Sequence, residues 1–119
     1  MFYAKLTLTA VIPLLFFIAC NRAAAPASVP VAENKSYAAS LFRQNCAICH
    51  GPDANGKTLE DGKVIPSLRK GEFKFKTDEQ IYKQIADGGN GMLPFRSQLT
   101  DREIKMLVDF VQNDLRKFP

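Results

Sequence analysis

The pentapeptide Cys46-Ala47-Ile48-Cys49-His50 constrains this chain more than any other stretch. Two thiols spaced in this way lie on one turn of helix, where both can bond to the vinyl groups of a single porphyrin, and the histidine that follows can bind the iron. A C-x-x-C-H run is therefore the signature of covalent haem attachment. We predict one haem c per chain, bound through Cys46 and Cys49, with His50 as an axial iron ligand.

Two other uses of a C-x-x-C pair fit this chain less well. A closed zinc site needs four ligands, whereas the chain has three cysteines and one histidine in total, and the third cysteine, Cys20, ends an apolar leader. A thioredoxin-like pair follows a strand in a β-α-β pattern, and the sequence shows no such pattern. The ligand inventory and the sequence context therefore favour haem.

Residues 1–19 are predicted to be a signal peptide of the lipoprotein type. The apolar run from Leu6 to Ala19 is shorter than the roughly 20 residues that a membrane-spanning helix needs, although an uncleaved membrane anchor is the alternative. Phe17-Ile18-Ala19-Cys20 resembles the lipobox of bacterial lipoproteins, with phenylalanine where leucine is usual. This resemblance implies that Cys20 is acylated, and that the protein is exported to the periplasm or the outer cell surface and anchored to a membrane by lipid.

The remainder of the chain divides into a linker and one domain. Residues 20–35 are rich in alanine, contain two prolines and lack apolar periodicity, which predicts a flexible linker behind the lipidated N-terminus. Residues 36–119 form the predicted haem domain. The net charge of +4 does not indicate a nucleic-acid binder. We expect the basic residues among 69–76 to be solvated, or to form a docking rim for acidic redox partners.

Three segments combine a helix-start signal with apolar residues at helical spacing. Ser36 can cap a helix that leads into Cys46, Thr77 can cap a second helix, and Thr100 with Glu103 forms a capping box for a third. The expected inner faces consist of Ala38, Leu41 and Phe42, of Ile81 and Ile85, and of Ile104, Leu107, Val108, Val111 and Leu115. We predict an all-α domain with three main helices packed around the haem. The last helix should cross the first, with Phe110 near Phe42.

The second axial ligand must come from another residue type, because His50 is the only histidine. Methionine, lysine or an open position all remain as alternatives at this point. Met106 falls beside the apolar stripe of the last predicted helix, where a methionine usually fills core space. Met92 lies in a loop rich in glycine, whose backbone can approach a porphyrin face closely, and is the better candidate. A carbonyl near Pro66 is the expected acceptor for the other ring N–H of His50.

The order of these features resembles that of the small monohaem class I cytochromes c of bacteria, from about Ser36 to Lys117. The shared features are a haem motif at the end of an N-terminal helix, a methionine in a Gly/Pro loop and a closing amphipathic helix. The resemblance implies a cytochrome c-like fold, with thioether bonds at Cys46 and Cys49. It also implies that His50 and Met92 bind the iron from opposite sides.

The same resemblance implies a function. It predicts a single-electron carrier without catalytic residues, which moves electrons between redox proteins of the cell envelope, and we expect a monomer. In this family proline commonly follows the ligand methionine directly, whereas here Leu93 precedes Pro94. One alternative is a haem enzyme or gas sensor in which Met92 dissociates, although no second histidine is present to assist there. Another is the electron-entry subunit of a larger oxidase or dehydrogenase.

Overall fold

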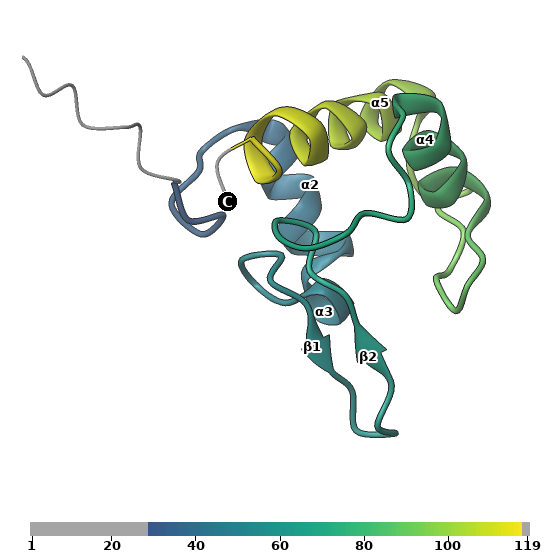
Figure 1. Cartoon of the computed structure of the whole chain (residues 1–119). Helices are drawn as coiled ribbons and strands as arrows, with labels where there is room; N and C mark the ends of the chain where they lie inside the picture. The colour runs from purple at the N-terminus through teal and green to yellow at the C-terminus, as the bar shows by residue number, and fades with distance from the viewer. Residues whose placement is uncertain (1–28, 118–119) are drawn as a thin grey trace, which may run out of the picture.

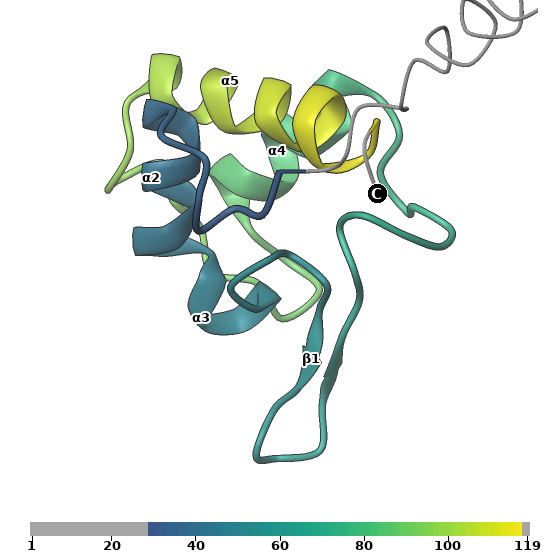
Figure 2. The same ribbon diagram turned by 90° about the vertical axis from the view of Figure 1, so that its left-hand side faces the viewer.

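A computed structural model of the chain describes residues 29–117, so the predicted signal peptide and Cys20 lie outside the described residues. The elements in chain order are α2 (Tyr37–Asn45), α3 (Ala47–His50), β1 (Lys57–Thr58), β2 (Val64–Ile65), α4 (Asp78–Asp87), α5 (Asp101–Asp109) and η1 (Phe110–Leu115). Figures 1 and 2 show α5 and η1 running as one helix across α2, with α4 alongside. The three main helices predicted from the sequence are therefore confirmed within the described part of the chain.

Each main helix starts at the capping residue that the sequence indicates. The Ser36 hydroxyl accepts a 3.2 Å hydrogen bond from the Ala39 N–H at the start of α2. Thr77 and Thr100 each form a complete capping box, the former with Gln80 and the latter with Glu103. These side chains satisfy N–H groups that the first helical turn leaves without a partner, which is why the helices begin where they do.

The core lies where the last helix crosses α2. Phe42 and Phe110 are each 1% exposed, and their ring centroids are 6.0 Å apart, so the predicted proximity of these two residues is confirmed. The other residues predicted for the inner faces are buried or pack against the core, namely Ala38, Leu41, Ile81, Ile85, Ile104, Leu107, Val108, Val111 and Leu115. α5 continues into η1, where the hydrogen bonding becomes π-helical.

A short antiparallel hairpin lies between α3 and α4. β1 and β2 pair with Lys57 opposite Ile65 and Thr58 opposite Val64. Val64 is 71% exposed. Strands of two residues are too short to show the alternation of apolar and polar residues that marks a strand in a sequence. The domain is thus mostly helical, with one small β-hairpin below α3 (Figure 1).

Folded structure begins earlier than the predicted domain boundary. Val31, which the sequence assigns to the linker, is 1% exposed and belongs to the hydrophobic core. Its N–H donates to Oδ1 of Asp53 at 3.0 Å, and its carbonyl accepts from Nη1 of Arg43 at 2.6 Å. The same guanidinium nitrogen donates to a second carbonyl of this turn at 2.8 Å. The linker prediction therefore fails for the residues around Val31, because alanine and proline content gives no sign of these distant polar partners.

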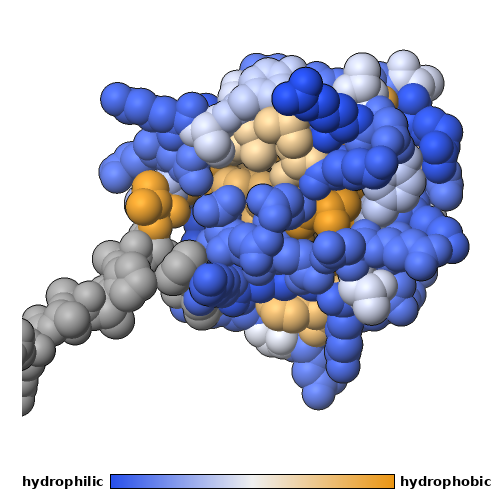
Figure 3. Space-filling model, turned by 90° about the horizontal axis from the view of Figure 1, so that it is seen from above, coloured by the Kyte–Doolittle hydropathy of each residue, from blue (hydrophilic) through white to orange (hydrophobic). Residues whose placement is uncertain are grey.

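One face of the molecule carries a small apolar area surrounded by hydrophilic side chains (Figure 3). The N-terminal end of α2 and the α5–η1 helix border an open cleft of about 670 Å³, lined in part by Ala38, Met106 and Phe110. No helix within residues 29–117 is long and apolar enough to cross a membrane.

Candidate haem-binding site

The haem motif, residues Cys46 to His50, follows directly from the C-terminal end of α2. The Cys46 N–H donates to the Phe42 carbonyl at 2.8 Å, which continues the hydrogen bonding of the helix. The N–H groups of Cys49 and His50 both donate to the Cys46 carbonyl, at 3.1 and 2.9 Å. Both cysteines are free thiols, Cys46 half-buried and Cys49 exposed. Two thiols on one helical turn are what two thioether bonds to one porphyrin require.

Burial sets the protonation of the haem motif. Desolvation, with a smaller contribution from the neighbouring Cys49, raises the pKa of the Cys46 thiol to about 12. Burial also lowers the pKa of His50, which favours the neutral imidazole that metals bind. The buried Nδ1 of His50 has no hydrogen-bond partner among the described residues. A buried nitrogen without a hydrogen-bond partner costs free energy. The motif therefore fits residues that hold a further group, as haem attachment requires.

The predicted hydrogen bond from His50 to a carbonyl near Pro66 is not formed among the described residues, because Nδ1 of His50 has no partner there. The backbone around Pro66 packs against Gly56. Gly56 has φ of 76°, and a Cβ there would lie 2.8 Å from the Pro66 carbonyl carbon and would overlap the Ile65 oxygen. The Gly56 N–H in turn donates to the His50 carbonyl at 2.9 Å. A glycine thus joins the backbone of His50 to the end of β2. The sequence gives no sign of this close approach, because Gly56 and Pro66 lie ten positions apart.

Met92 comes directly after a tight turn. α4 ends at Gly88, where φ is 72°, and the next turn has Asn90 and Gly91 at its centre with φ of 52° and 83°. Gly89 and Met92 exchange two backbone hydrogen bonds of 2.9 and 3.0 Å across it. Positive φ at both central residues is typical of the two-residue hairpin turn that Asn-Gly pairs prefer. The Asn-Gly pair is therefore the sequence signal that could have identified this turn.

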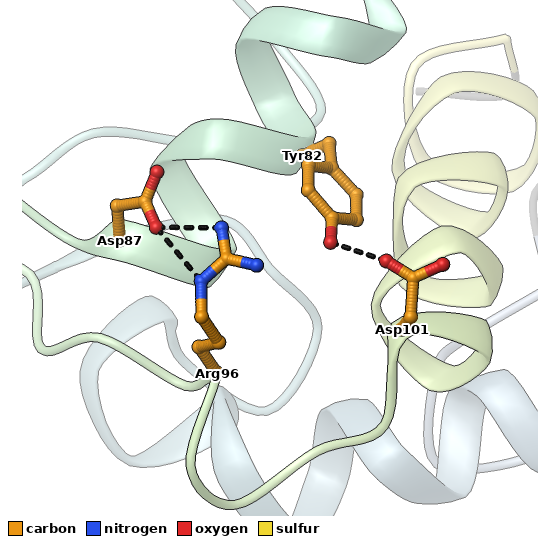
Figure 4. Close-up of polar contacts among 4 residues, drawn as sticks. All are labelled: Tyr82, Asp87, Arg96 and Asp101. Atoms are coloured by element: carbon orange, nitrogen blue, oxygen red, sulfur yellow. Dashed lines mark hydrogen bonds and ion pairs between the residues drawn. The ribbon is translucent and has the colours of Figure 1, made fainter.

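The chain after Met92 returns to the end of α4. The N–H groups of Phe95 and Arg96 donate to the carbonyls of Ile85 and Ala86, at 3.0 and 3.1 Å. These carbonyls belong to the last turn of the helix, which has no intrahelical donors for them. The Arg96 guanidinium forms an ion pair with Asp87 at 2.7 Å (Figure 4). The loop that carries Met92 is thus attached to α4 on its C-terminal side.

A second contact closes the same loop from the other end. The Tyr82 hydroxyl, from α4, donates to the carboxylate of Asp101 at the start of α5 (Figure 4). The Arg96 guanidinium lies 5.9 Å from the centroid of the Tyr82 ring. Since the first residue of α5 is bound to α4, the connection between the two helices has both ends anchored.

The Met92 turn, unlike Met106, contacts the β1–β2 hairpin that follows the haem motif. Nζ of Lys63, in the turn between β1 and β2, donates to the Gly91 carbonyl at 3.2 Å. The hairpin that follows the haem motif therefore contacts the turn that precedes Met92. Cys46 and Met92 also pack against the same hydrophobic core. Met106 instead lines the cleft beside the N-terminal end of α2, about 13 Å along the helix from the end that carries the haem motif.

Comparison with known proteins shows that the chain is similar to c-type cytochromes. The family described as "Cytochrome C oxidase, cbb3-type, subunit III" matches residues 33–111. A cytochrome c6 of Gracilaria tenuistipitata var. liui is 29% identical over 98 residues, which cover 82% of this chain and 89% of that protein. The FixPc subunit of a cbb3-type cytochrome c oxidase from Rhizobium leguminosarum bv. viciae is 36% identical over 75 residues, which cover 61% of this chain.

The matched region makes up a different share of the length of each relative. Among solved structures, the KustC0563 c-type cytochrome has a TM-score of 0.56 and 34% sequence identity, and the match covers 65% of this chain and 95% of that one. The chain spans 25% of the length of the FixPc subunit. It therefore matches small cytochromes over nearly their whole length and the oxidase subunit over about one quarter.

Proposed function

Because this chain belongs to the cytochrome c family represented by subunit III of cbb3-type cytochrome c oxidases, and so binds a haem c covalently, we propose that it is a single-electron carrier of the bacterial cell envelope. The observation that supports it most is the contact of Lys63 with Gly91. This contact joins the turn before Met92 to the hairpin that follows the haem motif, which supports Met92 as the second ligand of an iron bound by the one histidine.

Four side chains have defined roles in this proposal. The thiols of Cys46 and Cys49 would hold the haem covalently, each forming a sulfur–carbon bond to a vinyl group that takes up the thiol proton. His50, through its neutral imidazole, and Met92, through its thioether, would be the two protein ligands that hold the iron. The bound haem supplies an iron centre that takes up and releases one electron. The chain keeps the same two ligands in both oxidation states and has no catalytic residue.

The choice between the two methionines is tested by substitution in the protein carrying haem. Met92→Ala should abolish the iron–thioether absorption band of the oxidised protein and lower its reduction potential, because a sulfur ligand raises the potential. Met106→Ala should change neither property, since Met106 lines the cleft beside the other end of α2. Loss of the band in the Met106 variant, with its retention in the Met92 variant, would overturn the assignment.

Redox partners with acidic surfaces fit the charge of the chain. Lys70, Lys74 and Lys76 are exposed on the segment that leads into α4. Complementary charge mainly increases the rate of encounter, so electron transfer to an acidic partner should slow as ionic strength rises. We infer that the carrier acts as a monomer in such encounters.

The location of the protein is a separate part of the proposal. A signal peptide over residues 1–19 and acylation of Cys20 would export the domain and hold it at a membrane surface. Mass spectrometry of the mature N-terminus tests this part alone. An acylated Cys20 as the first residue supports it, and an unmodified cysteine or cleavage elsewhere contradicts it.

A second candidate function is an electron-entry subunit of a larger oxidase. The match to the cbb3-type subunit III family and to the FixPc subunit favours it. Native electrophoresis of mildly solubilised membranes, stained for haem, distinguishes the two candidates. Migration at the size of the chain alone supports the free carrier, and migration with a large complex supports the subunit.

A further inference from the structure

We propose that Lys63 and Lys74 are positioning residues that hold the Met92 turn in place and so limit how often the iron–sulfur bond opens. This inference rests on the proposed ligation of iron by Met92, and it adds two residues that do not touch the iron. Neither lysine carries a sequence pattern that distinguishes it from the other surface lysines of the chain.

The Asn-Gly pair favours the local shape of the turn before Met92, but the glycines around it leave the position of the turn weakly determined. Residues 88–91 all have positive φ, and three of these four are glycines. Glycine loses more backbone freedom on folding than any other residue, so a segment of this kind is ordered only when outside contacts hold it. The paired hydrogen bonds between Gly89 and Met92 shape the turn, but they do not fix its position relative to the haem motif.

Two lysines from different segments supply outside contacts. Lys63, from the turn of the β1–β2 hairpin, donates from Nζ to the Gly91 carbonyl at 3.2 Å. Lys74, from the segment before α4, donates from Nζ to Oδ1 of Asn90 at 2.8 Å. The two ammonium groups therefore bind the two central residues of the same turn. Each connects that turn to a segment earlier in the chain.

A third contact comes from α4 and completes the support. Nε2 of Gln84 donates to the Gly89 carbonyl at 2.8 Å, and its Oε1 accepts from Nδ2 of Asn90 at 3.3 Å. Gln84 holds the turn to the helix that it follows, over a separation of five and six positions. Lys63 holds it from the hairpin, and Lys74 holds it from the segment before α4. Contacts from both α4 and the lysine segments are needed if the Met92 thioether is to stay at one position.

The local shape of the turn is adapted to the contact with Lys63. Gly91 has φ of 83°, and a Cβ at this position would overlap Nζ of Lys63. The glycine thus serves the backbone conformation and the approach of the ammonium group at once. Both lysines donate to neutral oxygens rather than to carboxylates, so their charges stay available on the surface.

The test replaces each lysine by glutamine in the protein carrying haem, because a methionine would itself offer a thioether. Lys63→Gln and Lys74→Gln should each raise the rate of carbon monoxide binding to the reduced protein by about fivefold, the effect expected from losing one exposed hydrogen bond. The iron–thioether band of the oxidised protein should weaken in parallel. Arginine at either position should restore both properties, because it keeps a cationic donor.

Lys70→Gln is the matched control. It removes the same charge from an exposed position near Lys74, and the Lys70 side chain donates no hydrogen bond among residues 29–117. Its carbon monoxide binding and its absorption band should equal those of the unchanged protein. Thermal unfolding midpoints of all the variants show whether an altered rate accompanies a general loss of stability.

The outcomes separate this inference from the proposed function. If Met92→Ala opens the iron to carbon monoxide while both lysine variants behave like the unchanged protein, the positioning role is wrong and the carrier proposal stands. If Lys70→Gln has the same effect as the other two, general charge explains the result and the positioning role is again wrong. If Met92→Ala changes neither carbon monoxide binding nor the band, the proposed ligation itself fails.

Discussion

The hydroxyl of Tyr37, the first residue of α2, donates a 2.6 Å hydrogen bond to Oε1 of Glu103 in the first turn of α5, across a separation of 66 positions. The other oxygen of this carboxylate accepts from the N–H and the hydroxyl of Thr100, at 2.8 and 2.7 Å. The Tyr37 hydrogen bond, together with those from Thr100, lowers the pKa of Glu103 to about 2. One carboxylate thus caps α5 and joins it to α2.

Substitution of Glu103 should alter the dependence of stability on pH. A carboxyl group whose pKa is lower in the folded state contributes stability above its unfolded pKa and loses it as the pH falls toward the folded value. The thermal midpoint of the unchanged protein should therefore exceed that of Glu103→Gln at pH 6. The difference should shrink between about pH 5 and pH 2, since the unfolded pKa of glutamate is about 4.3. Scanning calorimetry over this range measures it.

Glu60→Gln is the control for this pH dependence. Glu60 is exposed in the hairpin loop, and its carboxylate accepts no hydrogen bond within the described residues. Its substitution should leave the slope of stability against pH close to that of the unchanged protein. A constant difference between the unchanged protein and Glu103→Gln from pH 6 to pH 2 would show that the charge of Glu103 is not responsible.

Alanine at Gly56 should destabilise the loop that follows the haem motif. Both Gly56 and Gly71 have positive φ, of 76° and 96°, but a Cβ at Gly71 meets nothing within 4 Å, whereas a Cβ at Gly56 meets the backbone of Ile65 and Pro66. Gly71→Ala should cost about 1–2 kcal/mol from backbone strain alone. Gly56→Ala should cost about 1–3 kcal/mol more, because its surroundings must move. Guanidinium unfolding of both variants measures the difference, and equal costs would contradict the close approach.

Truncation of Phe110 should remove a large part of the stability of the domain. Its ring is 1% exposed and lies against Phe42 at the crossing of α2 and the last helix, so Phe110→Ala should cost about 3–5 kcal/mol in the free energy of unfolding. Val64→Ala is the control, because Val64 is 71% exposed and should change stability by less than about 0.5 kcal/mol. A similar loss in the free energy of unfolding for the two variants would show that Phe110 is not part of the core.

Loss of the Arg43 side chain should release the turn around Val31. Arg43→Ala removes two hydrogen bonds to carbonyls of that turn, at 2.6 and 2.8 Å. Hydrogen exchange of a peptide covering residues 29–36 should become faster by about fivefold for each hydrogen bond lost. Arg102→Ala removes an exposed guanidinium from α5 and should leave this peptide unchanged. Unchanged exchange in the Arg43 variant would show that burial of Val31 alone holds the turn.

Much of the fold could be predicted because its signals are local. Ser36, Thr77 and Thr100 mark the helix starts through their own side chains, and the inner faces follow from spacing along each helix. The hairpin of β1 and β2 could not be predicted, because strands of two residues carry no periodic pattern. The residues around Val31 were assigned to the linker because their anchors, Arg43 and Asp53, lie elsewhere in the chain.

In the candidate site too, some features follow from local sequence signals and others depend on contacts between distant segments. The sequence by itself determined the chemistry of the haem motif, since two cysteines and a histidine within five residues define their own geometry on a helical turn. It also determined that any second histidine ligand was excluded. Only the tertiary structure decided that the turn before Met92 contacts the hairpin that follows this motif, through Lys63, and the segment before α4, through Lys74. Contacts of this kind depend on where distant backbone segments come to lie, and an exposed lysine carries no periodic pattern that reveals its partner.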